Sequence, residues 1–129
     1  MISFGSTGTD DAAAIKGRIA TNATFLQYIP IIDEDTGGRL ALASYDFELT
    51  FRERLDDTIV LRLTTVASAG ITKTTDTVGD ILLAVATPAS MANLDGAYRC
   101  SFSSTDSSDV ITLIASGLVV FTSDPAEWA

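Results

Sequence analysis

The chain has 129 residues, of which 47% are hydrophobic, and this size suits one domain around one apolar core. The formal net charge is −9, from 17 acidic and 8 basic residues, and repulsion argues against binding to nucleic acid or to an anionic membrane. The sequence has one cysteine, Cys100, and no histidine, which excludes an intrachain disulfide, a zinc cluster and histidine-dependent catalysis.

Residues 1–23 are rich in Ser, Thr, Gly and Ala and differ from the rest of the chain. Ile15 and Ile19 lie four positions apart, a spacing that permits a short helical turn. Two interpretations stay open: a frayed terminus, or an N-terminal arm that becomes ordered only on a neighbouring subunit. We therefore expect the folded domain to cover residues 24–129. The first residues lack the basic and apolar stretches of a signal peptide, which predicts synthesis in a cytoplasm.

From residue 24 onward the composition favours strands. TFLQYIPII (24–32) is rich in β-branched and aromatic residues, and Pro30 places this strand at a sheet edge or a bulge. DEDTGG (33–38) predicts a turn. YDFELTFRER (45–54) alternates apolar and polar residues, and TIVLRLTT (58–65) is expected to complete a hairpin with it.

The second half continues in the same way. GITKT (70–74) predicts a short strand, DILLAVAT (80–87) a strand with Ile81, Leu83 and Val85 on one face, and AYRCSFS (97–103) a strand with Tyr98, Cys100 and Phe102 on one face. VITLIASGLVVFTS (110–123) predicts one or two strands, interrupted near Gly117. About seven or eight short strands separated by turns predict an all-β fold, an antiparallel β-sandwich.

The connection between residues 86 and 97 predicts a crossing from one sheet to the other. Thr87 can cap a helical turn that begins at Pro88, and Met91 and Leu94 can fill the end of the sandwich. Gly96 then allows a tight bend into the next strand.

The spacing of Leu94, Gly96, Tyr98 and Cys100 resembles the tyrosine corner of immunoglobulin-like domains, in which a Tyr lies two residues before a strand-F cysteine. Two features depart from antibody domains: Cys100 has no partner cysteine, and the only tryptophan is Trp128, at the far end of the chain. We expect an Ig-like sandwich without the antibody disulfide.

Several motifs resemble the small Ig-like domains of tailed-bacteriophage virion proteins, such as the N-terminal domain of baseplate upper proteins. The resemblance covers most of residues 24–122 and rests on IIDEDTGGRLAL, YDFELTFRER, VLRLTT, ILLAVATPASMANLDGAYRCSF and SGLVVFTS, in this order. It implies a non-enzymatic structural part of a phage particle and brings no catalytic residues with it.

We therefore expect a virion structural protein, made in the host cytoplasm and associated with the tail or baseplate. It would dock by its arm and sheet edges on other virion proteins and on copies of itself. A capsid decoration or cement protein is the alternative, and a glycan- or host-surface-binding module is a second one. The candidate interface residues are Ile15, Ile19, Arg52, Arg54 and Trp128.

Each of these candidates has a plainer interpretation. Arg52 and Arg54 lie in FRERLDD, which also fits a solvated charge cluster at a turn. Trp128 can equally fold back on the core of its own domain.

We expect no catalytic site and no cofactor. DTG (35–37) matches the aspartic-protease tripeptide, but turn chemistry explains every residue of it. Asp33 with Asp35, or Asp106 with Asp109, could form a loose calcium site or simply be solvated turn carboxylates. Cys100 is expected to be a small core residue rather than a nucleophile.

Overall fold

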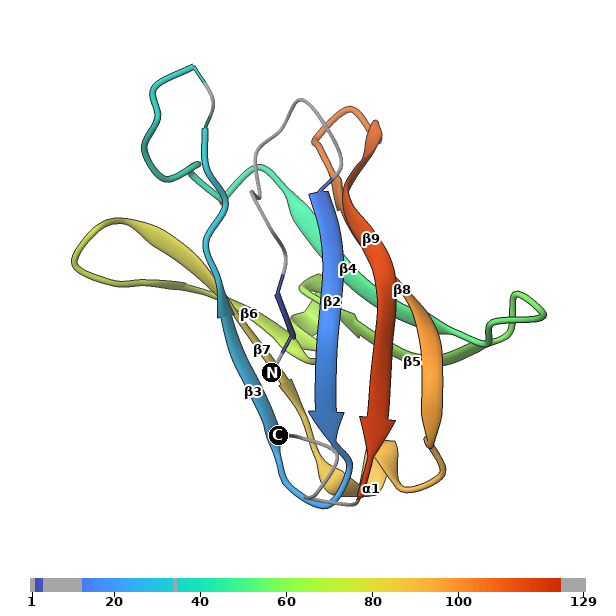
Figure 1. Ribbon diagram of the computed structural model, residues 1–129. Helices are drawn as coiled ribbons and strands as arrows, with labels where there is room; N and C mark the ends of the chain where they lie inside the picture. The colour runs from blue at the N-terminus through green and yellow to red at the C-terminus, as the bar shows by residue number, and fades with distance from the viewer. Residues whose placement is uncertain (1, 4–12, 34, 124–129) are drawn as a thin grey trace.

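The computed structural model in Figure 1 describes residues 2–3, 13–33 and 35–123. This part of the chain forms two sheets packed face to face, so the prediction of an all-β sandwich is confirmed. The larger sheet has the order β1-β2-β9-β8-β4-β5 and the smaller one the order β3-β7-β6. The strands are β1 (Ile2–Ser3), β2 (Ala13–Ala20), β3 (Phe25–Ile29), β4 (Asp46–Arg52), β5 (Ile59–Thr64), β6 (Ile71–Thr75), β7 (Asp80–Ala86), β8 (Gly96–Thr105) and β9 (Ile111–Thr122).

The strand order is Ig-like. β3, β7 and β6 occupy the places of strands B, E and D, and β9, β8 and β4 those of G, F and C, with β5 added at the edge beside β4. β3 is an edge strand and ends at Ile29, directly before Pro30, as the proline predicts. One pair departs from the expected antiparallel arrangement, because β2 runs parallel to β9.

The core lies between the two sheets. Phe47, Leu49 and Phe51 of β4 are all fully buried, as the alternation of this strand predicts. The ring of Phe51 meets the ring of Phe121 edge to face, with 5.1 Å between centroids. These side chains pack in one cluster with Ile29 and other buried residues of the smaller sheet.

β7 carries Ile81, Leu83 and Val85 on one face, as its alternation predicts, and this face is the outer one of the smaller sheet. Leu82, Ala84 and Ala86 point into the core, whereas Leu83 and Val85 lie half-buried on the outer face of the smaller sheet. The segment ILLAVA is apolar at every position, so its composition does not reveal which alternate residues face inward.

The prediction for the N-terminal segment is wrong where the structure describes it. Residues 13–20 form β2, and Ile15 and Ile19 are each 2% exposed within the core of their own domain. Positions four apart share one face of a strand as well as one face of a helix, so their spacing fits both structures. The strand is favoured because β9 offers it a partner along all eight residues. The domain therefore includes β2 and does not begin at residue 24; residues 4–12 lie outside the described part.

Gly117 allows this parallel pairing and does not interrupt β9, which is one continuous strand. It lies opposite Ile15, and a Cβ atom at residue 117 would lie 1.9 Å from the carbonyl oxygen of Ile15. The two backbones approach so closely that only glycine fits.

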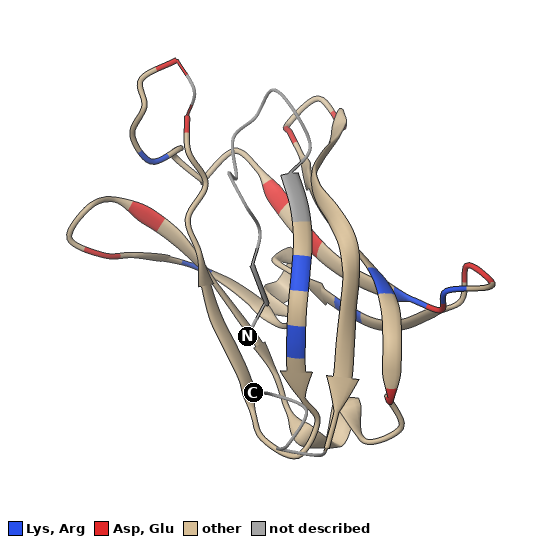
Figure 2. Ribbon diagram, in the orientation of Figure 1, with Lys and Arg blue, Asp and Glu red and all other residues tan. Residues whose placement is uncertain are grey.

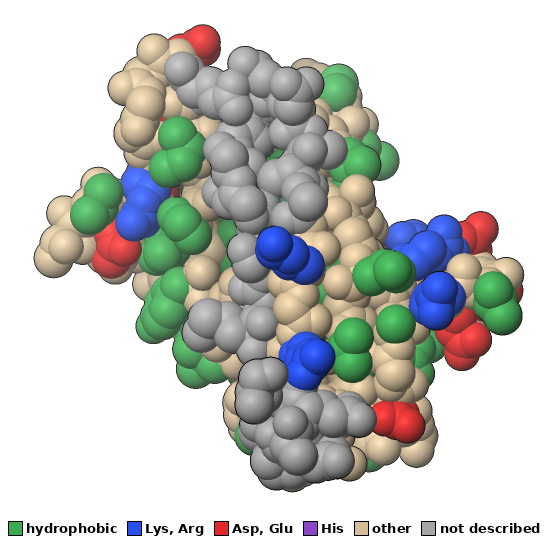
Figure 3. Space-filling view, viewed as in Figure 1, with side chains coloured by type: hydrophobic (Ala, Val, Ile, Leu, Met, Phe, Trp, Pro, Cys, Tyr) green, Lys and Arg blue, Asp and Glu red, His purple; other side chains and the backbone are tan. Residues whose placement is uncertain are grey.

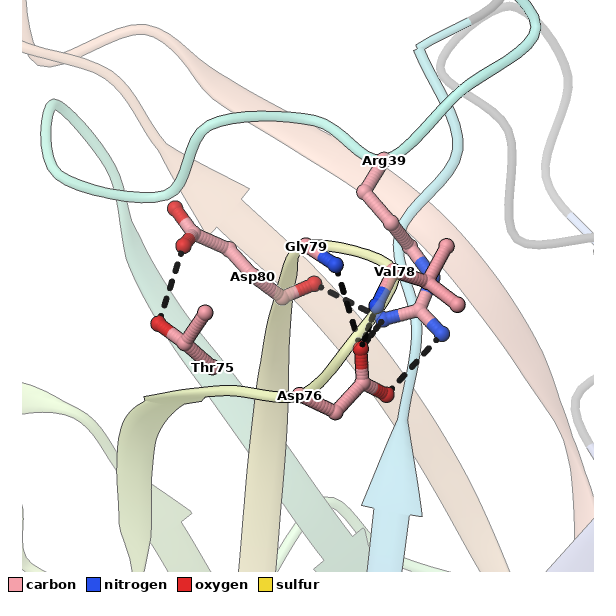
Figure 4. Close-up of polar contacts among 6 residues, drawn as sticks. All are labelled: Arg39, Thr75, Asp76, Val78, Gly79 and Asp80. Atoms are coloured by element: carbon pink, nitrogen blue, oxygen red, sulfur yellow. Dashed lines mark hydrogen bonds and ion pairs between the residues drawn. The ribbon is translucent and has the colours of Figure 1, made fainter.

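A polar cluster fixes the long connection between β3 and β4 (Figure 4). The Arg39 guanidinium pairs with the Asp76 carboxylate at 3.2 Å and donates to the carbonyl oxygen of Asp80 at 3.1 Å. The backbone N–H groups of Val78 and Gly79 also donate to Asp76, and the Val78 N–H is the main cause that lowers the pKa of this carboxyl group. The cluster ties the connection to the β6–β7 hairpin.

The close approach at Gly117 predicts that Gly117→Ala destabilises the protein by more than about 2 kcal/mol. The added methyl group must either separate the two backbones or release β2 and expose both isoleucines. Urea unfolding of the purified protein measures the loss. Gly38→Ala is the matched control, because its Cβ would meet only Thr36 Oγ1 at 3.8 Å. Equal stability of the two variants would contradict the pairing of β2 with β9.

Candidate interaction surfaces

The connection from β7 to β8 forms the predicted corner. Thr87 caps the short helix α1 (Pro88–Met91), and Met91 and Leu94 are buried beneath the end of the sandwich. Gly96 has a φ of 95°, which turns the chain into β8. The backbone N–H of Asp95 donates to the hydroxyl oxygen of Tyr98 at 3.3 Å, which is the bond back to the upstream backbone expected of a tyrosine corner. Leu94, Gly96 and Tyr98 therefore stabilise the turn into β8.

Cys100 is a core residue, as predicted. Its side chain lies between the sheets with only 2% of its surface exposed. Burial raises the pKa of the thiol well above its ordinary value, so the group stays protonated and a poor nucleophile at neutral pH.

In each acidic turn, an Asp carboxylate accepts hydrogen bonds from backbone N–H groups of the same turn. The carboxylate of Asp33 accepts from the N–H of Asp35 at 3.0 Å, and that of Asp106 accepts from the N–H groups of Ser108 and Val110. Within the described residues, no three Asp, Glu, Cys or His side chains come together as metal ligands. None of the helices described is long and apolar enough to span a membrane.

The outer face of the smaller sheet carries a patch of apolar side chains, here called the apolar face and made of Leu26, Tyr28, Leu83 and Val85. Leu26 lies opposite Val85, and Tyr28 lies opposite Leu83. Leu26 is 52% exposed and Tyr28 is 54% exposed, although both are on an ordered strand. Hydrophobic side chains are visible over this sheet at the left of Figure 3. The patch borders an edge strand, and contiguous apolar surface of this kind marks interaction sites on soluble proteins.

The outer face of the larger sheet is different, because it carries five of the eight basic residues of the chain: Lys16, Arg18, Arg52, Arg62 and Arg99. Four side chains lie opposite one another across β2, β9, β8 and β4, in the order Lys16, Leu118, Arg99 and Arg52, and we call them the basic row. In Figure 3, blue side chains cross this face from β2 toward the β4–β5 hairpin, with hydrophobic side chains between them.

A shallow hollow of about 380 Å³ lies along the basic row. Its lining includes Arg52, Arg99 and Leu118, together with the small residues Ser101 and Ser116. Arg52 donates to the Ser101 hydroxyl at 3.3 Å. The hollow thus combines two guanidinium groups with two hydroxyl groups.

The interface residues predicted from the sequence separate into three groups. Ile15 and Ile19 are buried in their own domain, so neither is available to a neighbour. Arg52 is half-buried in the basic row, and Arg54 is exposed in the β4–β5 hairpin. Trp128 lies outside the described residues.

Sequence reasoning missed Lys16, Arg99 and the apolar face. The two cations lie more than 80 positions apart and become neighbours of Leu118 only through strand pairing. The signal available in the sequence was the alternation within β2 and β8. It places each cation on the face of its strand that points away from the buried side chains.

No protein-family model and no curated protein matches this sequence.

The corner predicts that Tyr98→Phe destabilises the domain by about 1 kcal/mol, because the Asp95 N–H loses its acceptor. Urea unfolding measures the change. Tyr28→Phe is the matched control: it removes the same hydroxyl from an exposed tyrosine and is expected to leave stability unchanged. Identical unfolding of the two variants would show that the corner bond contributes nothing.

Burial of Cys100 predicts that its thiol does not react with a disulfide reagent such as DTNB in the folded protein. One thiol per chain should react once the protein is unfolded in urea. The absorbance of the released thiolate measures the number of reactive thiols per chain in the folded and in the unfolded protein. Rapid reaction of the folded protein would place Cys100 outside the core.

Proposed function

We propose that this protein is a non-enzymatic structural component of a tailed-phage virion, held in the tail or baseplate by contacts with neighbouring proteins. Its docking surface is the apolar face of the smaller sheet. The observation that carries the proposal is the exposure of Leu26 and Tyr28, each more than half exposed on an ordered edge strand.

The geometry of the apolar face supports docking by a sheet face. Its four side chains form two directly opposed cross-strand pairs, so they present one continuous surface. Burying such surface against a neighbour contributes roughly 25 cal/mol for each Å² removed from water.

The Ig-like strand order also supports the proposal, because it is the architecture that the resemblance to phage virion domains implies. Fold alone does not specify function, so the exposed face carries the argument. We assign to this face the docking on neighbours that was expected of an N-terminal arm, because Ile15 and Ile19 are buried within the domain itself. The alternative is capsid decoration, in which the same apolar face would bind the surface of a capsid.

We expect the purified protein to sediment with tails from virions of a phage that encodes it, and the double variant Leu26→Asp/Tyr28→Asp to remain in the supernatant. Two carboxylates would have to be buried without partners in the docked complex, so binding is lost. Mass spectrometry of the pelleted tails and of separated capsids measures the bound protein.

Leu55→Asp is the control, because Leu55 is fully exposed in the β4–β5 hairpin and lies away from the apolar face. It is expected to bind as the unchanged protein does. Binding to capsids alone would replace the tail assignment with decoration. Absence from both fractions, or equal binding of the double variant, would refute the proposal.

A further inference from the structure

The basic row contains an arrangement that is unfavourable for the isolated sheet. Arg99 and Arg52 lie directly opposite each other on β8 and β4, and like charges in this relation destabilise a strand pair. Lys16 completes the row on β2, about 14 Å from Arg52 at ordinary strand spacing. An anionic partner across this face would remove the repulsion.

Carboxylates of the described residues neutralise only part of the positive charge of the row. Arg99 pairs with Asp57 and donates to the carbonyl oxygens of Glu53 and Asp56. Among the described residues, however, Lys16 and Arg52 have no carboxylate within ion-pair distance. The hollow beside them is open to carboxylate side chains from outside.

Other parts of the same chain carry carboxylate side chains that could bind there. Five of the eight cations lie on the outer face of the larger sheet, which leaves three to offset the acidic residues elsewhere. The β3–β4 connection and the β8–β9 turn are both at the upper end of the sandwich in Figure 1, and Figure 2 shows acidic residues in both. We call Asp33, Asp35, Asp106 and Asp109 the acidic end. Asp35 and Asp109 are exposed.

We infer that the basic row of one copy binds the acidic end of a second copy. The two surfaces lie on different parts of the molecule, so the contact is heterologous and joins copies head to tail into a ring or a filament. Opposite charges steer the copies together and set their relative orientation. The place of such an assembly in a particle rests on the proposed function, but the contact itself does not.

Sedimentation velocity of the purified protein tests the contact without any phage component. We expect association at low ionic strength, about 0.02 M, and dissociation at about 0.5 M, where screening shortens the range of the attraction. The variant Lys16→Glu/Arg52→Glu should associate at least about tenfold more weakly at low salt. Circular dichroism checks that it is folded, which we expect because neither side chain is part of the buried core.

A charge-matched variant on the other sheet is the first control. Lys73→Glu/Thr72→Glu/Thr77→Glu also lowers the net charge by four, at exposed positions in and beside β6. It should associate as the unchanged protein does. If both variants lose association equally, net charge alone governs it and the inference is wrong.

Changing the acidic end tests the other half of the contact. Asp35→Lys/Asp109→Asn should weaken association as the basic-row variant does; asparagine is chosen because it tolerates the φ of 62° at residue 109. Association that is unaffected by either variant, or a salt-independent monomer, would overturn the inference. So would specific binding of an acidic oligosaccharide to the basic row of a protein that stays monomeric. Self-association without incorporation into tails would instead leave the contact standing and refute the proposed function.

Discussion

The close contact between β2 and β9 determines both the core of this protein and the basic row on its surface. The two backbones can pair in parallel because residue 117 has no side chain. This pairing buries Ile15 and Ile19, which then close one side of the core. Alternation along the same strand carries Lys16 to the outer face, beside Leu118 and in line with Arg99. A single packing constraint therefore completes the sandwich and assembles its basic row.

The two outer faces of the sandwich suit different contacts. The smaller sheet presents apolar side chains on β3 and β7, while the larger sheet presents cations in a chain of net charge −9. Burial of the apolar face would supply most of the free energy of docking, whereas the charged row favours one orientation over others.

Much of the fold was predictable because local patterns matched the environment of each strand. β4 alternates strictly and shows its inner face in the sequence, and the spacing from Leu94 to Tyr98 predicted the corner that the hydroxyl contact confirms. The inner face of β7 could not be predicted, because the segment ILLAVA is apolar at every position, and β2 was missed because residues four apart share a face in helices and strands alike. The surfaces were harder to predict, since the basic row joins residues from four strands and exists only once their registers are set. Arg52 was found from the sequence because it belongs to a local charge cluster. The other residues of the basic row were not found.

Hydrogen exchange of the backbone amides in dilute purified protein tests the central contact most directly. If β2 is part of the domain, the amides of residues 15–20 that face β9 exchange as slowly as those in the centres of β8 and β9, at a concentration where no neighbour is bound. Exchange of these amides as fast as that of the exposed turn at residues 107–109 would contradict the account. It would return β2 to the role of an arm that needs a partner, and the basic row would then not exist in the isolated protein.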